Sequence, residues 1–253
     1  MKTQRRPATA GFTLIEIVVI IAVLTILATA IMPMVLQQVV DQKIETTRKE
    51  AKTINEAIVG RSDVPGQFGF VGDMGRLPYS FEELLRPQRE AVLFTAVTFR
   101  GVGMGWKGPY INVGDTKEDV LTDAFGRPYG GIETGQVRSA GPDGVMGNED
   151  DIVYPPNPPN IRGRVIVTIK RMAAEDQSYT LDPAGYEVRL YYSDNGHQAM
   201  LADNIAPFVF ENVPQGIHAI EVNRLKRNQI VVQDTIQSFG GGATKLVELY
   251  FRL

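Results

Sequence analysis

Residues 12–40 read FTLIEIVVIIAVLTILATAIMPMVLQQVV and form the most apolar stretch of the chain. From Ile17 to Val40 the sequence runs for 24 residues without a charged side chain. As an α-helix this run is about 36 Å long, which exceeds the roughly 30 Å of a bilayer's hydrocarbon core. The stretch therefore predicts a helix that spans a membrane once.

The residues before this stretch, MKTQRRPATAG, carry three basic side chains and no acidic one. Basic residues beside a span stay on the cytoplasmic side, so we expect the rest of the chain outside the inner membrane. An ordinary secretory signal has its small-residue cleavage site after the apolar run, whereas Gly11 lies before it. Cleavage after Gly11 would leave Phe12 as the first residue of a chain that keeps its apolar helix.

Glu16 is the one acidic residue near the start of this apolar stretch. An ionised carboxylate inside a bilayer costs several kcal/mol unless it is neutralised or paired. In one interpretation Glu16 reaches back to the lipid headgroups. In the other it forms an intermolecular salt bridge with the free α-amine of Phe12 in a neighbouring copy, which would fix the axial stagger between stacked helices.

The helical pattern continues beyond the apolar stretch. Small or apolar residues recur at alternating steps of four and three, which places them on one helix face: Val40, Ile44, Thr47, Ala51, Ile54 and Ile58. Gly60 suits the left-handed position that ends a helix. We therefore predict one helix from Phe12 to Val59, whose stripe packs on the chain's own sheet. A groove of a partner protein is the alternative.

The composition excludes several classes of function. The 253 residues contain no Cys and two His and have a net charge of −3. Disulfides, thiolate metal sites and Cys nucleophiles are thereby excluded, and neither a multi-His centre nor nucleic-acid binding is expected. The sequence has no GxSxG or HExxH motif, and GVGMGWKG at 101–108 lacks the Lys-Ser/Thr ending of a phosphate loop. We expect no enzymatic activity.

An acidic segment, SAGPDGVMGNEDDI at 139–152, contains Asp143, Glu149, Asp150 and Asp151 within nine residues. Close carboxylates repel one another unless something positive lies among them. A hard cation such as calcium, which takes six to eight oxygen ligands, would provide that charge. The order of residues is not that of an EF-hand. From spacing alone, a solvated acidic turn and a cation site both remain open.

The last third of the chain has a different residue pattern, typical of β-strands. Residues 155–160 read PPNPPN, a stiff extended spacer that indicates a domain boundary. Apolar and polar residues then alternate in VIVTIK, EVRLYY and KLVELYF, and turn residues separate most of the runs. Six or seven strands between residues 161 and 253 predict an antiparallel β-sandwich.

The segment GFTLIE, from Gly11 to Glu16, resembles the class III signal of type IV pilins and type II secretion pseudopilins. The resemblance implies that prepilin peptidase cuts after Gly11 and methylates Phe12. It also implies that Glu16 acts in filament assembly, and Pro33 matches the proline of the family's helix. Proline removes one intrahelical hydrogen bond, so the backbone near it can loosen when the helix packs into a filament.

Three further segments resemble the major pseudopilin of type II secretion systems in order and spacing: GDMGRLPYSFEEL at 72–84, WKGPYINV at 106–113 and LTDAFGRPYGG at 121–131. This resemblance implies that the acidic loop binds structural calcium. The implied ligands are the carboxylates of Asp143 and Asp151 first, then Asp150, with the carbonyl groups of Ala140 and Val145. The loop here is shorter than the usual pseudopilin version. FVFENVPQGIHAIEV, at 208–222, resembles transthyretin-like or carboxypeptidase-regulatory-like modules.

Together these features predict an α+β fold: a long N-terminal pilin helix with a small antiparallel-sheet head, followed by an all-β sandwich. The expected parts are a cleaved leader (1–11), a transmembrane and assembly helix (12–60), a head with a calcium loop (61–154), a Pro-rich linker (155–160) and the sandwich (161–253).

We expect a filament subunit that polymerises with copies of itself and with other pilin-like subunits. Its further partners would be prepilin peptidase, an inner-membrane assembly platform and, before assembly, the membrane. The head would lie in the periplasm and the filament would be periplasmic or extracellular. Two alternatives are a minor pilin or adhesin that displays the sandwich, and a membrane-anchored binding protein that never polymerises.

Overall fold

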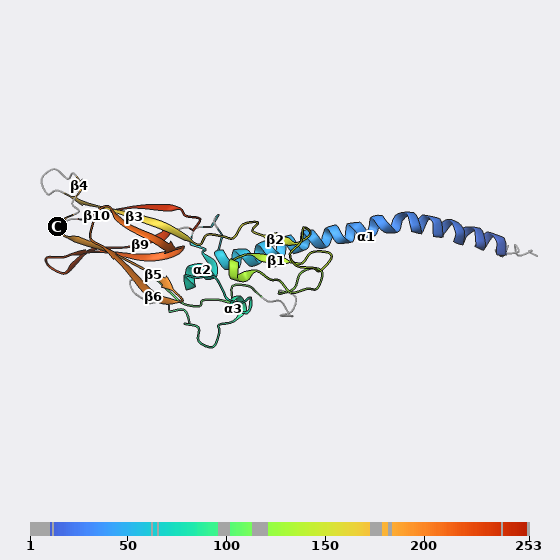
Figure 1. Ribbon diagram of the computed structural model, residues 1–253, viewed down its shortest axis with the longest axis horizontal. Helices are drawn as coiled ribbons and strands as arrows, with labels where there is room; N and C mark the ends of the chain where they lie inside the picture. The colour runs from blue at the N-terminus through green and yellow to red at the C-terminus, as the bar shows by residue number, and fades with distance from the viewer. Residues whose placement is uncertain are drawn as a thin grey trace, which may run out of the picture. The chain divides into compact units, whose positions relative to one another are not determined.

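The structure is a computed structural model that describes residues 11, 13–61, 63–64, 66–95, 102–112, 121–172, 179–181, 184–238 and 240–251. The chain divides between Glu45 and Thr46 into two compact units. The first contains the N-terminal part of a long helix, and the second contains the end of that helix and all other elements (Figure 1). The predicted α+β class is confirmed.

The long helix α1 spans Leu14–Val59, close to the predicted 12–59. It ends where predicted, because Gly60 adopts φ of +81°, a conformation that residues with a Cβ rarely accept. Four members of the predicted stripe are buried, namely Thr47, Ala51, Ile54 and Ile58. Ala51, Ile54 and Ile58 pack into one apolar cluster with residues of the head such as Phe70. The stripe therefore packs on its own chain.

The head is built from short elements around that cluster. They are α2 (Gly69–Met74), α3 (Glu82–Leu85), the 3-10 turn η2 (Ile132–Thr134), β1 (Val137–Ser139) and β2 (Ile152–Tyr154). The two strands pair antiparallel, with Val137 opposite Tyr154. This small antiparallel sheet is the one predicted for the head.

Two sheets form the C-terminal part (Figure 1). The strands are β3 (Arg162–Met172), β4 (Tyr179–Leu181), β5 (Tyr186–Asp194), β6 (His197–Asp203), β7 (Phe208–Pro214), β8 (Gly216–Arg224), β9 (Gln229–Ser238) and β10 (Thr244–Phe251). One sheet has the order β10-β3-β4 with β7 also paired to β3, and the other has the order β6-β5-β8-β9. Residues of both sheets share one core, including Val167, Leu190, Phe208 and Ile220.

This sandwich differs from the prediction in two ways. The last strand, β10, pairs parallel with β3, whereas an antiparallel sandwich was expected. Alternation of apolar residues identifies a strand but not its partner or its direction, which depend on long-range packing. The described residues of the sandwich also form eight strands, β3 to β10, rather than six or seven. The added β6 follows a two-residue turn at Asn195-Gly196, both with positive φ, which is a strong hairpin signal.

The sandwich packs on its own head within the second unit. Ser193 Oγ donates a hydrogen bond to the carbonyl oxygen of Asp73 over 2.7 Å. The Gly196 amide donates to the carbonyl oxygen of Met74 over 3.0 Å. At the end of α1, Gln215 Nε2 donates to the carbonyl oxygen of Val59 over 2.6 Å. Because α2 and α1 each supply carbonyl acceptors to the sandwich, the junction involves both helices.

Candidate assembly segment and acidic loop

The predicted processing site lies just before α1. Gly11 is exposed, and a Cβ added to it would meet no atom within 4 Å. Phe12 lies outside the described residues. The helix is started by Thr13, whose carbonyl oxygen accepts the amides of Glu16 and Ile17 over 3.1 and 3.2 Å. Helix α1 begins at Leu14, after Gly11, while the roles assigned to Gly11 and Phe12 stay predictions.

Glu16 lies in the first turn of α1 and is exposed. A negative side chain is stabilised there by the helix dipole, typically by about 0.3–1 kcal/mol. Among the described residues, no hydrogen bond or ion pair reaches its carboxylate. Both interpretations of Glu16, a position at the lipid headgroups and a salt bridge to a neighbouring copy, therefore stay open.

Pro33 lies inside α1, and the helix continues through it. Proline has no amide proton, so the carbonyl oxygen of Thr29, one turn earlier, receives no helical hydrogen bond from residue 33. The threonines of this segment are satisfied within the helix: Thr25 Oγ1 donates to the carbonyl oxygen of Ile21 over 2.8 Å, and Thr29 Oγ1 donates to that of Ile26 over 2.9 Å. Such internal pairing suits an apolar environment.

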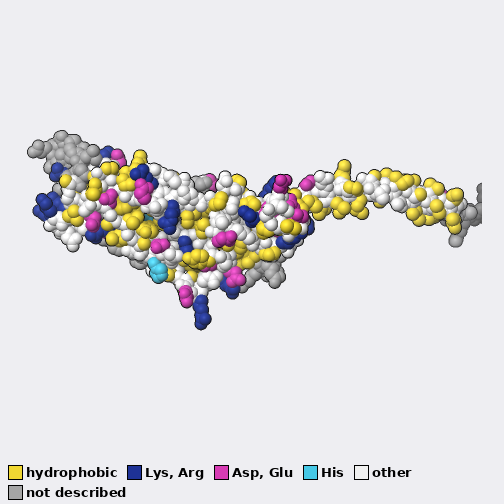
Figure 2. Space-filling model, viewed as in Figure 1, with side chains coloured by type: hydrophobic (Ala, Val, Ile, Leu, Met, Phe, Trp, Pro, Cys, Tyr) yellow, Lys and Arg dark blue, Asp and Glu magenta, His cyan; other side chains and the backbone are white. Residues whose placement is uncertain are grey.

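The first part of α1 exposes a continuous apolar surface. Its most apolar window of 18 residues has a mean hydropathy of 2.9, and none of that window is buried in the subunit. Figure 2 shows hydrophobic side chains along this part of the helix, while Lys, Arg, Asp and Glu gather elsewhere. The most exposed large residues include Leu14 at 84%, Ile15 at 72% and Met34 at 70%. By length and composition, α1 can cross a membrane.

In the acidic loop, three predicted ligands hold the loop together. Asp143 Oδ1 accepts the amide of Val145 over 2.8 Å, and its Oδ2 accepts Asn148 Nδ2 over 2.8 Å. The Asp143 amide in turn donates to Asp150 Oδ2 over 3.1 Å. Asp151 Oδ2 accepts the amide of Gly147 over 2.8 Å. The carboxylates of Asp143, Asp150 and Asp151 are therefore brought into one loop, where they bind backbone and amide N–H groups.

Further oxygen atoms of the loop were predicted, or are available, as ligands of a cation. Asp151 Oδ1 is buried without a hydrogen-bond partner. The carbonyl oxygen of Ala140 accepts the Gly144 amide over 3.1 Å, and the Val145 side chain is exposed. The guanidinium of Arg127 donates to the carbonyl oxygens of Gly141 and Pro142.

The oxygen donors and the unpartnered Asp151 Oδ1 fit a hard cation in chemical type. However, in the described part of the chain no three His, Cys, Asp or Glu side chains come together as a metal-binding group.

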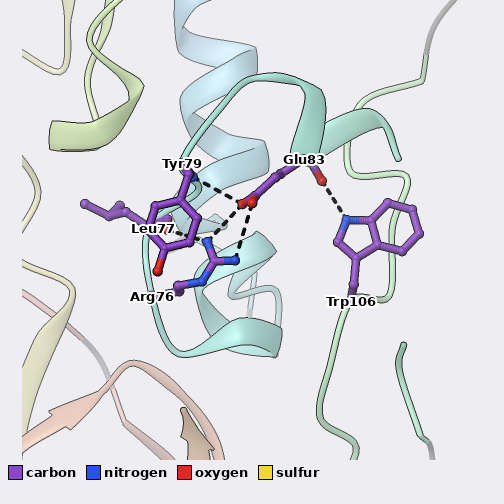
Figure 3. Close-up of polar contacts among 5 residues, drawn as sticks. All are labelled: Arg76, Leu77, Tyr79, Glu83 and Trp106. Carbon is purple, nitrogen blue, oxygen red and sulfur yellow. Dashed lines mark hydrogen bonds and ion pairs between the residues drawn. The ribbon is translucent and has the colours of Figure 1, made fainter. Parts of the chain in front are cut away.

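A second polar group, missed in the sequence, organises the head (Figure 3). Arg76 forms a mostly buried ion pair with Glu83 over 2.9 Å, and its guanidinium lies 3.9 Å from the ring centre of Tyr79. Glu83 also accepts the Tyr79 amide with its carboxylate and Trp106 Nε1 with its carbonyl oxygen, over 3.2 and 2.6 Å.

A third polar group, around Asp73 and Tyr110, also links residues 72–84 to residues 106–113. Tyr110 Oη donates to Asp73 Oδ2 over 2.9 Å and accepts the Lys107 amide over 3.0 Å. Burial raises the pKa of Asp73, while the hydrogen bond from Tyr110 and the charge of Lys107 act in the opposite direction. The segments 72–84 and 106–113 are therefore in contact through Asp73–Tyr110 and Glu83–Trp106.

His218 is buried in β8 and has a structural environment. Its Nε2 donates to the carbonyl oxygen of Pro214 over 2.9 Å and lies 2.6 Å from Ser238 Oγ. Burial lowers the pKa of His218 to about 4, and the hydrogen bond with Pro214 acts in the opposite direction. The imidazole is therefore neutral near pH 7, with its proton on Nε2 because a carbonyl can only accept.

Comparisons with known proteins bear mainly on the N-terminus. Residues 6–32 match the family model described as the prokaryotic N-terminal methylation motif, a range that includes Gly11, Phe12 and Glu16. No curated protein sequence matches the chain.

One solved structure, a "putative carbohydrate binding protein" from Pseudomonas aeruginosa, is 10% identical over 36% of this chain and 89% of its own, with a TM-score of 0.26. This likeness is too distant to bear on fold or ligand. What the comparisons establish is that the N-terminal segment of this chain carries the prokaryotic N-terminal methylation motif.

Proposed function

We propose that this protein is a structural subunit of a type IV pilin-like filament, assembled through α1 after prepilin peptidase processing. One observation carries the proposal: a helix that matches the methylation motif leaves its apolar surface uncovered within the subunit. Such a surface needs either lipid or other apolar helices around it. A membrane before assembly and a helical stack after assembly would supply these two environments in turn.

Glu16 supports polymerisation over a simple anchor. A membrane anchor gains nothing from a carboxylate near the start of its apolar run, whereas a stack of identical helices can use it to fix their register. The resemblance of the head to the major pseudopilin supports a type II secretion pseudopilus among such filaments. The sandwich would then lie on the surface of that filament, and the protein would act by assembly rather than by catalysis.

The test is electron microscopy of sheared surface and periplasmic fractions, combined with mass spectrometry of the mature N-terminus. We expect filaments whose subunit begins with methylated Phe12. Abundant subunits along the filament length would support a major subunit, and scarce subunits at the tip would instead identify a minor pilin or adhesin. An N-terminus at Met1 without any filaments would overturn the proposal.

Glu16→Ala provides a sharper version of the same test. It should abolish filaments while the protein still accumulates in the membrane, because only the intermolecular pairing is lost. The matched control is Glu211→Ala, which removes an exposed carboxylate of the sandwich whose side chain is 59% accessible. Normal filaments formed by the Glu16 variant would favour a role at the lipid headgroups.

For the acidic loop, we propose structural calcium bound by Asp143 and Asp151, with Asp150 and the carbonyl groups of Ala140 and Val145 as further candidates. The support is the oxygen-rich donor set and the buried, unpartnered Asp151 Oδ1. Calcium would stabilise a loop-rich head that has no disulfides.

A further inference from the structure

The second unit contains a cavity whose lining residues all lie outside the apolar N-terminal part of α1. It has a volume of about 580 Å³ and lies between the end of α1, α2, the 102–110 segment and Ile217 of β8. Backbone forms much of its wall, because six of its lining residues are glycines: Gly60, Gly66, Gly69, Gly72, Gly103 and Gly108. This volume is within the range of about 300–1,000 Å³ typical of small-ligand sites.

Asp73 supplies a partly available acceptor in this cavity. One oxygen, Oδ2, is fixed by the Tyr110 hydroxyl over 2.9 Å. The other oxygen, Oδ1, receives no hydrogen bond from any described residue. The Tyr110 hydroxyl is itself held by the Lys107 amide over 3.0 Å, so the carboxylate is oriented before any ligand arrives. A partly buried carboxylate oxygen without a donor favours a ligand that brings O–H or N–H groups.

The rest of the wall combines aromatic residues with balanced charge. The aromatic residues Phe68, Phe94 and Tyr110 are among the lining residues, and Lys107 Nζ lies 5.1 Å from the ring centre of Phe94. The charged lining residues are two acids and two bases: Glu56, Asp73, Arg61 and Lys107. Because these charges cancel, the cavity favours an uncharged ligand that has an apolar face together with several hydrogen-bonding groups.

We propose that this cavity binds a short neutral oligosaccharide. A sugar ring presents hydroxyl donors and acceptors around its edge and C–H groups on its faces, which matches the Asp73 carboxylate beside aromatic rings. An extended peptide would need a free strand edge to pair with. The one lining residue that lies in a described strand is Ile217 of β8, which pairs with Gln237 of β9. The pairing of β8 with β5 ends at Ala219, and beyond it β8 lies against α2, where a Cβ on Gly216 would be 3.1 Å from the carbonyl oxygen of Gly72.

The test uses full-length protein in a zwitterionic detergent, because detergents with sugar headgroups would compete. Trp106 is the only tryptophan of the chain, and its ring centre lies 5.9 Å from that of Tyr110. Titration with maltotriose, cellotriose and chitotriose should give a saturable change in tryptophan emission for at least one of them. Saturation-transfer NMR with the same three sugars provides a readout that does not depend on Trp106.

Three variants locate the site. Asp73→Asn and Tyr110→Phe should each weaken binding at least tenfold, and Ile217→Trp should block it by filling the cavity without touching the Asp73–Tyr110 pair. The control is Asp234→Asn, an exposed residue of β9, which should bind like the wild type. Circular dichroism melts identify any variant that fails to fold.

Two results would overturn the proposal: no binding of any of the three sugars by either readout, or binding that folded Ile217→Trp protein retains in full. Because the protein is tested without filaments, neither result depends on polymerisation.

Discussion

Acid should destabilise the folded protein through His218. The side chain is 2% exposed, and its Nδ1 is buried without a hydrogen-bond partner. Burial holds the pKa of His218 at about 4 in the folded chain, against 6.5 for an ordinary histidine. As the pH falls from 6.5 towards 4, His218 becomes protonated in the unfolded chain but stays mostly neutral in the folded chain. Stability is therefore greatest above pH 6.5 and is lost towards pH 4.

The magnitude follows from the two pKa values. Proton linkage gives a loss of about 2 kcal/mol in the free energy of unfolding between pH 7 and pH 5, and about 3 kcal/mol by pH 4. For a domain whose total stability is about 5–15 kcal/mol, this is a large fraction from one side chain.

The assay is urea unfolding of the full-length protein in zwitterionic detergent, followed by circular dichroism at pH 7, 6 and 5. His218→Gln keeps an N–H that can reach the Pro214 carbonyl but does not titrate. It should lose about 2 kcal/mol less than the wild type between pH 7 and pH 5. His197→Gln, at the exposed other histidine, is the matched control and should follow the wild type. Equal pH dependence in both variants and the wild type would refute the reasoning.

Three further predictions concern the head and the helix. Arg76→Met leaves the Glu83 carboxylate buried and unpaired and should cost about 3 kcal/mol of stability in urea unfolding. Arg86→Met breaks an exposed ion pair and should cost below about 1 kcal/mol, so equal losses would contradict the burial argument. Chelation with EGTA should lower the Tm, and Asp143→Ala should lower it without chelator. An unchanged Tm after both EGTA treatment and the Asp143→Ala substitution would exclude the calcium proposal. Pro33→Ala restores an amide donor in α1 and should slow hydrogen exchange in the preceding turn, whereas unchanged exchange would argue against a loosened backbone there.

Local sequence signals were reliable where one short segment decides the structure. The 3.6-residue periodicity and Gly60 defined α1 almost to the residue, and alternation identified most strands of the sandwich. The dipeptide Asn195-Gly196 is a further local signal, since both residues adopt positive φ in the turn of the β5–β6 hairpin. The Arg76–Glu83 pair joins residues seven positions apart, and no local pattern pointed to it.

Contacts between segments that are distant in the chain could not be predicted from local sequence patterns. The bond from Ser193 to Asp73 joins residues 120 positions apart, and β10 pairs with the strand that begins the sandwich. In both cases the local pattern reports that a face is buried but carries no information about what covers it. The cavity beside Asp73 has the same origin, since α1, α2 and β8 reach it from separate parts of the sequence.

The sequence by itself determined the N-terminal motif, the apolar helix and the β-rich C-terminal part, because each depends on the order of residues along a single stretch. Only the tertiary structure decided that the sandwich packs on its own head, that Arg76 and Glu83 organise that head, and that Asp73 faces a cavity. These features depend on which surfaces meet when distant segments compete to bury apolar area and satisfy polar groups, and that competition is settled by the folded chain as a whole.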